Sequence, residues 1–316
     1  MQKNLIAALI LVASLTSGAR AQMPSPPPIQ IVDPAPGGLR IVERGIFANY
    51  FPGKGAGPRP GILLLAGSEG GLPPEHIASA LQQEGFAVLQ LCYFGCPGLP
   101  DKLVRVPLET FADGLEWLRH RPDIDPVRLA ILSGSKGSEA GLLAASRDSG
   151  LKAVVATQPS SVAWPGIAYS PDIQPGWIEQ GKPIPYLPYA NISIAEKGLF
   201  ARYNEALPDL PAHPEAVIPV ERIGAPILLV CGEADSLWPS CPMADQIAAR
   251  LRQAGKPAPQ ILRYPDAGHE VFGLPIAETD PHYAHLGSLG GTPAGIAAAH
   301  ADAWPKVLAF LKEHLK

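Results

Sequence analysis

One segment of the sequence has the residue types and spacing of a catalytic nucleophile. An apolar run leads directly into Ser133-Gly134-Ser135-Lys136-Gly137, and a helix-forming stretch of small residues follows. This strand–turn–helix context is typical of a nucleophile elbow, with Ser135 as the nucleophile. The strand and helix backbones nearly touch in such an elbow, so the positions two before and two after the nucleophile need small side chains. Here they are Ser133, in place of the usual glycine, and Gly137.

Two later segments supply an acid and a base. Asp235 follows the apolar run 226–231, and His269 follows the run 260–264. The carboxyl ends of parallel strands meet at one edge of a sheet, so we expect both side chains to face Ser135. The order Ser, Asp, His along the chain is that of α/β hydrolases. His269 would take the proton from Ser135 Oγ, and Asp235 would orient the imidazole and stabilise the imidazolium.

An oxyanion hole would need two N–H donors that point at the reacting carbonyl oxygen. The backbone N–H of Lys136, the residue after the nucleophile, is the expected first donor. The glycine-rich loop 67–71 follows another apolar run, and Ser68 or Glu69 in it would supply the second. A plain glycine turn is the alternative. A phosphate-binding loop is disfavoured, because the sequence lacks the Gly-Lys-Ser/Thr ending of that motif.

The segments that must position these residues alternate between strands and helices. The strands are apolar without polar alternation, as strands covered on both faces must be. Helices are predicted at 107–119 and 242–254, where apolar residues recur every three or four positions. The pattern predicts an α/β-hydrolase fold with a mostly parallel, doubly wound sheet. The predicted strands are 62–66, 86–91, 128–132, 153–156, 226–231 and 260–264.

The alternation stops between 157 and 224, where prolines, glycines and aromatic residues are frequent. This stretch is too long for a plain loop in a compact domain, and its aromatic content is unlike that of disordered chains. We interpret it as a lid-like insertion over the strand ends; a structural excursion on the sheet edge is the alternative. Trp164 and Trp177 are predicted to form an apolar, substrate-binding acyl pocket beneath it.

The N-terminus has the three parts of a signal peptide. Lys3 provides positive charge, 5–15 are almost all apolar, and Ala19-Arg20-Ala21 is a small-residue cleavage site. Eleven residues are too few to span a bilayer, so no stable membrane anchor is expected. We therefore predict a signal peptide at 1–21, an extended Pro-rich leader at 22–38, a hydrolase domain at 39–316, and a periplasmic or secreted protein.

The charge and cysteine content narrow the classes of partner. The 25 basic and 29 acidic side chains give a net charge of −4, and cleavage after residue 21 would make it −6. This balance disfavours nucleic-acid binding. Export makes disulfides possible. Proximity in the sequence suggests Cys92–Cys96 and Cys231–Cys241, although four cysteines allow three pairings.

No cofactor or metal is predicted. A zinc site is disfavoured because the cysteines have no CxxC spacing. His282 and His285 are three residues apart, but the sequence suggests no third ligand beside them.

These segments together resemble a known family. The chain is similar, in order and over about 40–315, to the C-terminal catalytic domain shared by acyl-CoA thioesterases and bile-acid-CoA:amino-acid N-acyltransferases, within the α/β hydrolases. The similar stretches are 65–71, 93–100, 107–109, 134–137, 181–186, 218–221, 232–235, 237–240, 264–265, 268–269 and 290–293.

The resemblance implies catalysis on acyl thioesters, with Ser135, Asp235 and His269 in the positions of nucleophile, acid and base. Serine at the nucleophile position accompanies hydrolysis in this family, whereas cysteine accompanies transfer to an amino acid. The expected function is therefore hydrolysis of a small-molecule acyl thioester or ester. An acyltransferase and a non-catalytic binding protein on the same scaffold are the alternatives.

Overall fold

The computed structural model describes residue 29 and residues 31–167 and 173–316. The predicted signal peptide lies outside these residues, as do residues 22–28 and 30 of the predicted leader. Residues 31–38 lie against the domain: the backbone N–H of Ala35 donates to the Glu75 carboxylate at 3.1 Å, and the Arg40 guanidinium donates to the Val32 carbonyl at 2.5 Å. In the described part of the chain, no helix combines the length and apolar character that crossing a membrane requires.

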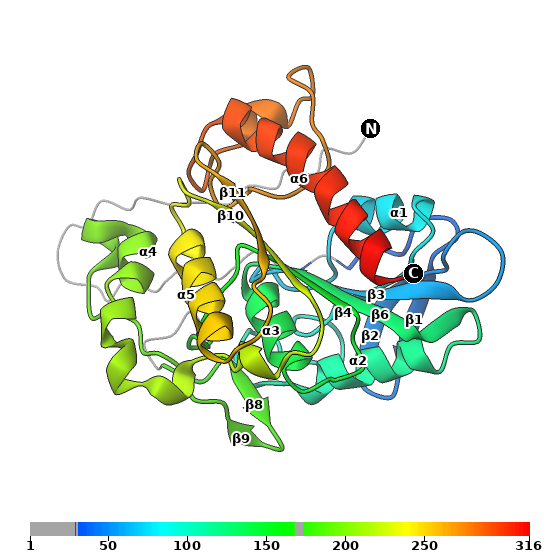
Figure 1. The fold of residues 1–316 in the computed structure, drawn as a ribbon, viewed down its shortest axis with the longest axis horizontal. Helices are drawn as coiled ribbons and strands as arrows, with labels where there is room; N and C mark the ends of the chain where they lie inside the picture. The colour runs from blue at the N-terminus through cyan, green and yellow to red at the C-terminus, as the bar shows by residue number, and fades with distance from the viewer. Residues whose placement is uncertain (1–28, 30, 168–172) are drawn as a thin grey trace.

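A central sheet of eight strands organises the fold (Figure 1), and its strand order is β1-β2-β4-β3-β6-β7-β10-β11. The first two strands pair antiparallel with each other, and β2 pairs antiparallel with β4; every other neighbour is parallel. The strands are β1 (Leu39–Glu43), β2 (Ile46–Phe51), β3 (Arg59–Leu65), β4 (Ala87–Cys92), β6 (Ile124–Gly134), β7 (Ala153–Thr157), β10 (Ile227–Gly232) and β11 (Gln260–Tyr264).

Helices cover both faces of this sheet. One face packs on α1 (Glu75–Gln83) and α6 (Pro293–His314), and the other packs on three helices. Strand β3 shows why the apolar runs lack polar alternation: Leu63 lies in the core of one face, and Ile62 lies in the core of the other. The predicted doubly wound α/β fold is confirmed. The three helices of the second face are α2 (Glu109–Arg119), α3 (Lys136–Ala145) and α5 (Ser240–Gln253).

All six predicted strands are present, but the antiparallel hairpin β1–β2 was not among the predictions. Its two-residue turn, Arg44 and Gly45, has φ of 52° and 78°. Two positive φ values are typical of the type I′ turn, whose twist matches that of the flanking strands. Arg-Gly is not one of the usual sequence signals for this turn, so the hairpin was difficult to recognise from sequence.

The described residues of the stretch 157–224 form short elements. Strands β8 (Trp177–Glu179) and β9 (Lys182–Pro183) join β5 (Val106–Pro107) in a second, three-stranded sheet. Helix α4 (Ile194–Asn204) has a non-helical residue at Gly198 and lies beside α5 in Figure 1. Three 3-10 turns follow, at Leu207–Ala212, Pro214–Ala216 and Val220–Arg222; a fourth, outside the stretch, is Tyr283–His285.

The insertion has a small core of its own. Trp164, Leu187 and Tyr203 are buried against Trp238 and Met243, which belong to the segment that enters α5 and to α5 itself. The insertion is therefore packed against the domain through apolar contacts as well as through its small sheet.

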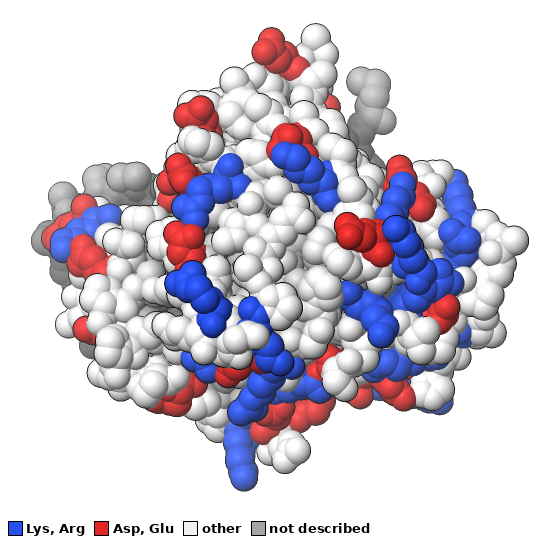
Figure 2. Space-filling model, viewed as in Figure 1, with Lys and Arg blue, Asp and Glu red and all other residues white. Residues whose placement is uncertain are grey.

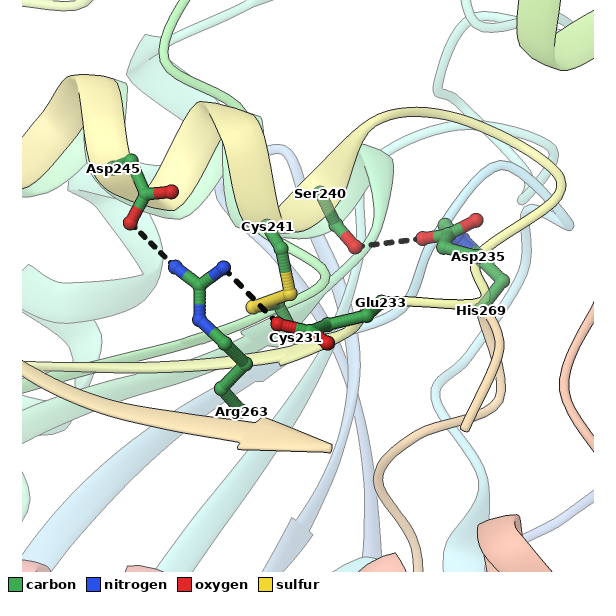
Figure 3. Close-up of a disulfide and its surroundings, with 8 residues drawn as sticks. All are labelled: Cys231, Glu233, Asp235, Ser240, Cys241, Asp245, Arg263 and His269. Atoms are coloured by element: carbon green, nitrogen blue, oxygen red, sulfur yellow. Dashed lines mark hydrogen bonds and ion pairs between the residues drawn. A yellow bond between two sulfur atoms is a disulfide. The ribbon is translucent and has the colours of Figure 1, made fainter. Parts of the chain in front are cut away.

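Charged side chains of both signs are mixed on the face in Figure 2. Oppositely charged side chains also form ion pairs: Arg263 of β11 pairs with both Glu233 and Asp245 (Figure 3). Such pairs cancel much of the local field.

The structure pairs Cys92 with Cys96 and Cys231 with Cys241. The second disulfide joins the end of β10 to the first turn of α5, and the loop that it closes contains Asp235 (Figure 3).

Replacing both Cys231 and Cys241 by serine is expected to lower the free energy of unfolding by about 2–3 kcal/mol, because the unfolded chain regains the freedom of a ten-residue loop. Urea unfolding would measure the loss. Serine at Cys92 and Cys96, which close a shorter loop, is the control and should cost less. Equal losses for the two pairs would contradict this expectation.

Candidate active site

The turn between β6 and α3 holds Ser135 in a strained backbone conformation, with φ 54° and ψ −128°. A non-glycine residue rarely adopts such a positive φ, and strain of this kind is typical of functional sites. The strain is maintained by close packing, because a Cβ on Gly137 would lie 2.0 Å from the Ala66 carbonyl oxygen at the end of β3. Glycine is therefore required at 137.

The serine at 133, where an elbow usually has glycine, is accommodated by a second glycine on α3. A Cβ on Gly141 would lie 2.6 Å from Ser133 Oγ, so only a residue without a side chain leaves room for this hydroxyl. The hydroxyl also donates to the Val155 carbonyl at 3.2 Å. The departure from the usual motif is thus matched by a local change in packing.

The structure brings Ser135, His269 and Asp235 together in a hydrogen-bonded chain. His269 Nε2 lies 2.8 Å from Ser135 Oγ, and His269 Nδ1 lies 2.9 Å from Asp235 Oδ2. Asp235 and His269 are buried, whereas Ser135 is partly exposed. This is the geometry in which an imidazole can accept the serine proton while the carboxylate holds the other ring nitrogen.

Asp235 is fixed by three donors from its own loop. Its Oδ1 accepts the backbone N–H groups of Leu237 and Trp238 at 2.9 and 3.2 Å, and its Oδ2 accepts Ser240 Oγ at 2.8 Å (Figure 3). Ser240 was not singled out from the sequence, although its position at the start of a helix, five residues after the acid, is a usable signal. These donors fix the carboxylate in the orientation that His269 needs.

Backbone contacts hold the His269 loop against the Asp235 loop. A Cβ on Gly268 would lie 1.9 Å from the Gly290 carbonyl oxygen, and one on Gly290 would lie 2.0 Å from the Ala234 carbonyl oxygen. The His269 N–H also donates to the Leu289 carbonyl at 3.0 Å. The Gly-Gly motif near the C-terminus therefore positions the acid and base by letting three loops pack backbone to backbone.

Helix α3 presents its first N–H groups at the nucleophile. Those of Ser138 and Glu139 donate to the Ser135 carbonyl, whereas the N–H groups of Lys136 and Gly137 precede the first bonds within the helix. Free N–H groups at a helix N-terminus stabilise nearby negative charge. The location of the Lys136 N–H thus suits an oxyanion donor.

The loop 67–71 also lies beside the nucleophile, in addition to the N-terminus of α3. A Cβ on Gly67 would be 3.1 Å from Ser135 Cβ, and Tyr93 Oη lies 2.8 and 2.5 Å from the carbonyl oxygens of Ala66 and Gly67. Ser68 is partly exposed and Glu69 is exposed on the turn that follows. The buried Tyr93 hydroxyl fixes the start of this turn. Burial raises the pKa of Tyr93 well above its usual value, and the nearby charges of Glu69 and Glu139 add smaller contributions.

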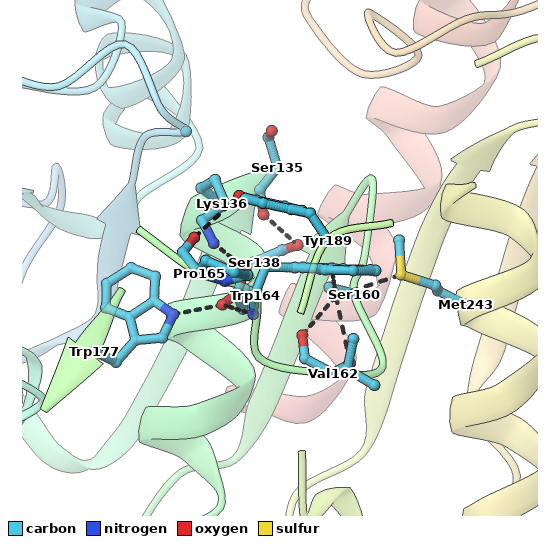
Figure 4. A network of polar contacts seen from close by, with 12 residues as sticks. Ser135, Lys136, Ser138, Ser160, Val162, Trp164, Pro165, Trp177, Tyr189 and Met243 are labelled. Carbon is cyan, nitrogen blue, oxygen red and sulfur yellow. Dashed lines mark hydrogen bonds and ion pairs between the residues drawn. The ribbon is translucent and has the colours of Figure 1, made fainter. Parts of the chain in front are cut away.

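A buried ion pair that was not predicted from the sequence lies directly behind the elbow. Lys136 Nζ donates to Glu139 Oε2 at 2.6 Å, and both side chains are almost wholly buried. Glu139 Oε1 accepts the Trp164 N–H at 2.8 Å and the Trp177 indole N–H at 2.5 Å (Figure 4). Glu139 therefore ties the insertion to the helix that carries the nucleophile.

This arrangement corrects the expectation for the two tryptophans. Trp164 and Trp177 are 0% and 1% exposed, and the Trp164 indole N–H donates to Ser160 Oγ at 2.9 Å. Their indoles are enclosed by protein, so neither presents a surface to substrate in this structure. They anchor the insertion instead of lining an acyl pocket.

Burial and ion pairing shift the pKa values of Lys136 and Glu139 in opposite directions. Burial, the larger effect, raises the pKa of the Glu139 carboxyl and lowers the pKa of the Lys136 ammonium, whereas attraction between the two groups opposes both shifts. Neither group is stable in this position as a lone charge. In the described ranges, no three His, Cys, Asp or Glu side chains are grouped as metal ligands.

Solved structures identify the class of fold. The α/β-hydrolase enzyme MGS-M1 from a Medee basin deep-sea metagenome library is 15% identical, with a TM-score of 0.56, over 88% of this chain and 97% of its own. The α/β hydrolase GrgF from Penicillium sp. sh18 is 17% identical, with a TM-score of 0.52, over 88% of this chain and 98% of its own. The fold is that of the α/β hydrolases.

The sequence identifies the family within this class. Residues 106–316 match the family described as "BAAT / Acyl-CoA thioester hydrolase C terminal", and the chain belongs to it. Mitochondrial acyl-coenzyme A thioesterase 2 of Mus musculus is 34% identical over 290 residues, which are 89% of this chain and 61% of that protein. Acyl-coenzyme A amino acid N-acyltransferase 1 of Mus musculus is 32% identical over 285 residues, which are 87% of this chain and 65% of that protein. The resemblance inferred from the sequence is confirmed, and the chain spans less than two thirds of these two relatives.

The packing between α3 and β6 predicts a coupled pair of substitutions. Gly141→Ala is expected to cost about 1–3 kcal/mol of unfolding free energy, because its methyl group would overlap the Ser133 hydroxyl. Combining it with Ser133→Gly removes the overlap, so the double variant should lose less than the sum of the two single losses. Urea unfolding of all four proteins measures the coupling. Additive losses would show that the hydroxyl is not what Gly141 accommodates.

The buried pair predicts a second coupling. Glu139→Ala is expected to cost about 3–5 kcal/mol of unfolding free energy, because it leaves the Lys136 ammonium buried without a partner. The double variant Lys136→Met with Glu139→Leu removes both charges and should recover most of that loss. Thermal and urea unfolding would measure both. A double variant no more stable than Glu139→Ala would place the loss in the tryptophan bonds instead of the charge.

Proposed function

We propose that this protein hydrolyses a small-molecule acyl thioester or ester through an acyl-Ser135 intermediate. The observation that carries the proposal is the chain of hydrogen bonds from Asp235 through His269 to Ser135, at 2.9 and 2.8 Å. Membership in the thioester hydrolase family supports the same reaction class.

In the proposed first half-reaction, Ser135 Oγ attacks the acyl carbon while His269 Nε2 takes the hydroxyl proton. The oxygen of the tetrahedral intermediate becomes negative and would be stabilised by the Lys136 N–H with a second donor from Ser68 or Glu69. Collapse of the intermediate breaks the bond to the leaving group, which takes the proton from His269. The products of this step are the free thiol or alcohol and the acyl enzyme.

In the second half-reaction, a water molecule gives a proton to His269 as its oxygen attacks the acyl carbon. The bond to Ser135 Oγ then breaks, and the serine recovers its proton from the imidazolium. The product is the free carboxylic acid. Asp235 remains ionised and stabilises the imidazolium in both steps.

The substrate class is inferred from the relatives. Their names describe acyl-coenzyme A thioesterases and an acyl-coenzyme A amino acid N-acyltransferase, so an acyl-CoA is the first thioester to test. Serine at the nucleophile position favours water as the acceptor, as the family resemblance implies. The acyltransferase alternative predicts that an added amino acid captures the acyl group, which product analysis would detect.

We also propose that the protein is exported and that 157–224 act as a lid. The basic and apolar N-terminal segments with a small-residue cleavage site support export. N-terminal sequencing of protein from the periplasm or culture medium should then begin at Gln22.

The packing of Trp238 against both Tyr203 of the insertion and His269 supports the lid, with ring centroids 5.7 Å apart in each pair.

Ser135→Ala is expected to lower kcat/KM by at least about 1000-fold, because the triad acts as a unit and only its surroundings remain. Hydrolysis of acyl-CoA and p-nitrophenyl esters would measure the loss. Ser149→Ala, an exposed serine on the loop after α3, is the matched control and should keep the wild-type rate.

A fluorophosphonate probe separates this proposal from a non-catalytic binding protein. The wild type should be labelled at Ser135, and the Ser135→Ala variant should not. If the folded wild type is not labelled under conditions in which a control hydrolase reacts, the proposal that this protein is a serine hydrolase is refuted.

A further inference from the structure

The side chain of Glu69 places a negative charge beside the nucleophile. Its Oε2 lies 2.7 Å from the position that a Cβ on Gly67 would occupy, and Ser135 Oγ lies 3.5 Å from that same position. The missing side chain of Gly67 thus lets the carboxylate and the reacting hydroxyl approach the same point from two directions. An acyl group attached to Ser135 Oγ must begin within a few ångströms of this point.

The carboxylate is held in place by one of its two oxygens. Oε1 accepts the Gly67 N–H at 3.1 Å, and Tyr93 fixes the carbonyl groups on either side of that N–H. Oε2 accepts no hydrogen bond from the described residues, and Glu69 is exposed. The geometry leaves one charged oxygen available to a ligand.

Among the described residues, no cation neutralises this charge. Within the described ranges Glu69 forms no ion pair, and Lys136, which follows the nucleophile in the chain, is buried and bound to Glu139. His269 is engaged by Ser135 and Asp235. The negative field of Glu69 is therefore directed at whatever enters the site.

We propose that Glu69 makes this site select acyl groups that carry a cationic group, such as an ammonium, within a few bonds of the scissile carbonyl. This inference rests on the proposed hydrolase function and names the substrate class of that same site. An acyl ammonium next to Ser135 would pair with Glu69 Oε2, whereas a neutral acyl group gains nothing from the carboxylate and an anionic one is repelled.

A purely structural role for Glu69 makes a different prediction. The bond to the Gly67 N–H needs an acceptor oxygen and no charge, and glutamine supplies that oxygen at the same length. Glu69→Gln therefore keeps the turn and removes the charge. A structural role leaves substrate preference unchanged in this variant, while a specificity role does not.

The test compares two thioesters of N-acetylcysteamine, the β-alanyl and the butyryl, which differ only by an ammonium in place of a methyl group. The wild type is expected to have a higher kcat/KM for the β-alanyl thioester. Glu69→Gln should reduce this preference by about two- to fivefold, the effect of one solvent-screened ion pair. Glu69→Lys should reverse it.

Two controls isolate the charge near the nucleophile. Glu116→Gln removes the same charge from an exposed position near the C-terminal end of α2 and should leave the preference unchanged. Raising the salt concentration to about 1 M, where charges are screened beyond about 3 Å, should shrink the preference of the wild type but not that of Glu69→Gln.

Fluorophosphonate labelling of Ser135 in every variant shows that its triad is intact. With labelling retained, a preference that Glu69→Gln and Glu69→Lys both leave unchanged overturns the selectivity and leaves the hydrolase proposal standing. A wild type that neither labels nor turns over any thioester overturns the hydrolase proposal, and the selectivity falls with it.

Discussion

The close approach of helix α3 to the end of β3 is the constraint on which the site depends. A residue with any side chain at 137 would meet the Ala66 carbonyl, so the helix can start at this point only because glycine is there. That contact holds Ser135 at φ 54° and aims its hydroxyl at His269. It also sets the distance between the N-terminus of α3 and the loop 67–71. The nucleophile and the two walls of its site are therefore positioned by a single backbone contact.

The buried pair behind the elbow gives the insertion a fixed connection to the nucleophile helix. Removing two charges from water is costly, and such pairs seldom stabilise a fold more than apolar side chains would. Glu139 nevertheless satisfies three donors at once, from Lys136, Trp164 and Trp177. A carboxylate at this position specifies one arrangement of the insertion, because any other would leave a buried charge or an indole N–H without a partner.

The sequence was sufficient for features that depend on local patterns. The apolar runs predicted the six central strands, and the residues after three of them predicted Ser135, Asp235 and His269, which lie together in the structure. Features that depend on contacts distant in the chain were not predicted. Glu139 has the sequence context of an ordinary helix residue, and its two tryptophan partners lie 25 and 38 residues away. Trp164 and Trp177 are buried because of those contacts, which the sequence does not reveal. The aromatic content of 157–224 alone favours a substrate pocket, and that prediction is wrong for these two residues.

The three loops around Asp235 and His269 meet through glycine backbones that leave no room for side chains. Almost any substitution at Gly268 or Gly290 would move the acid or the base. The turn at 68–69 is under no such restriction, since its side chains reach solvent while Tyr93 secures only the residues before it. Divergence among descendants of this protein, or directed evolution in the laboratory, would therefore be concentrated on that turn, where new preferences can arise without disturbing the chemistry.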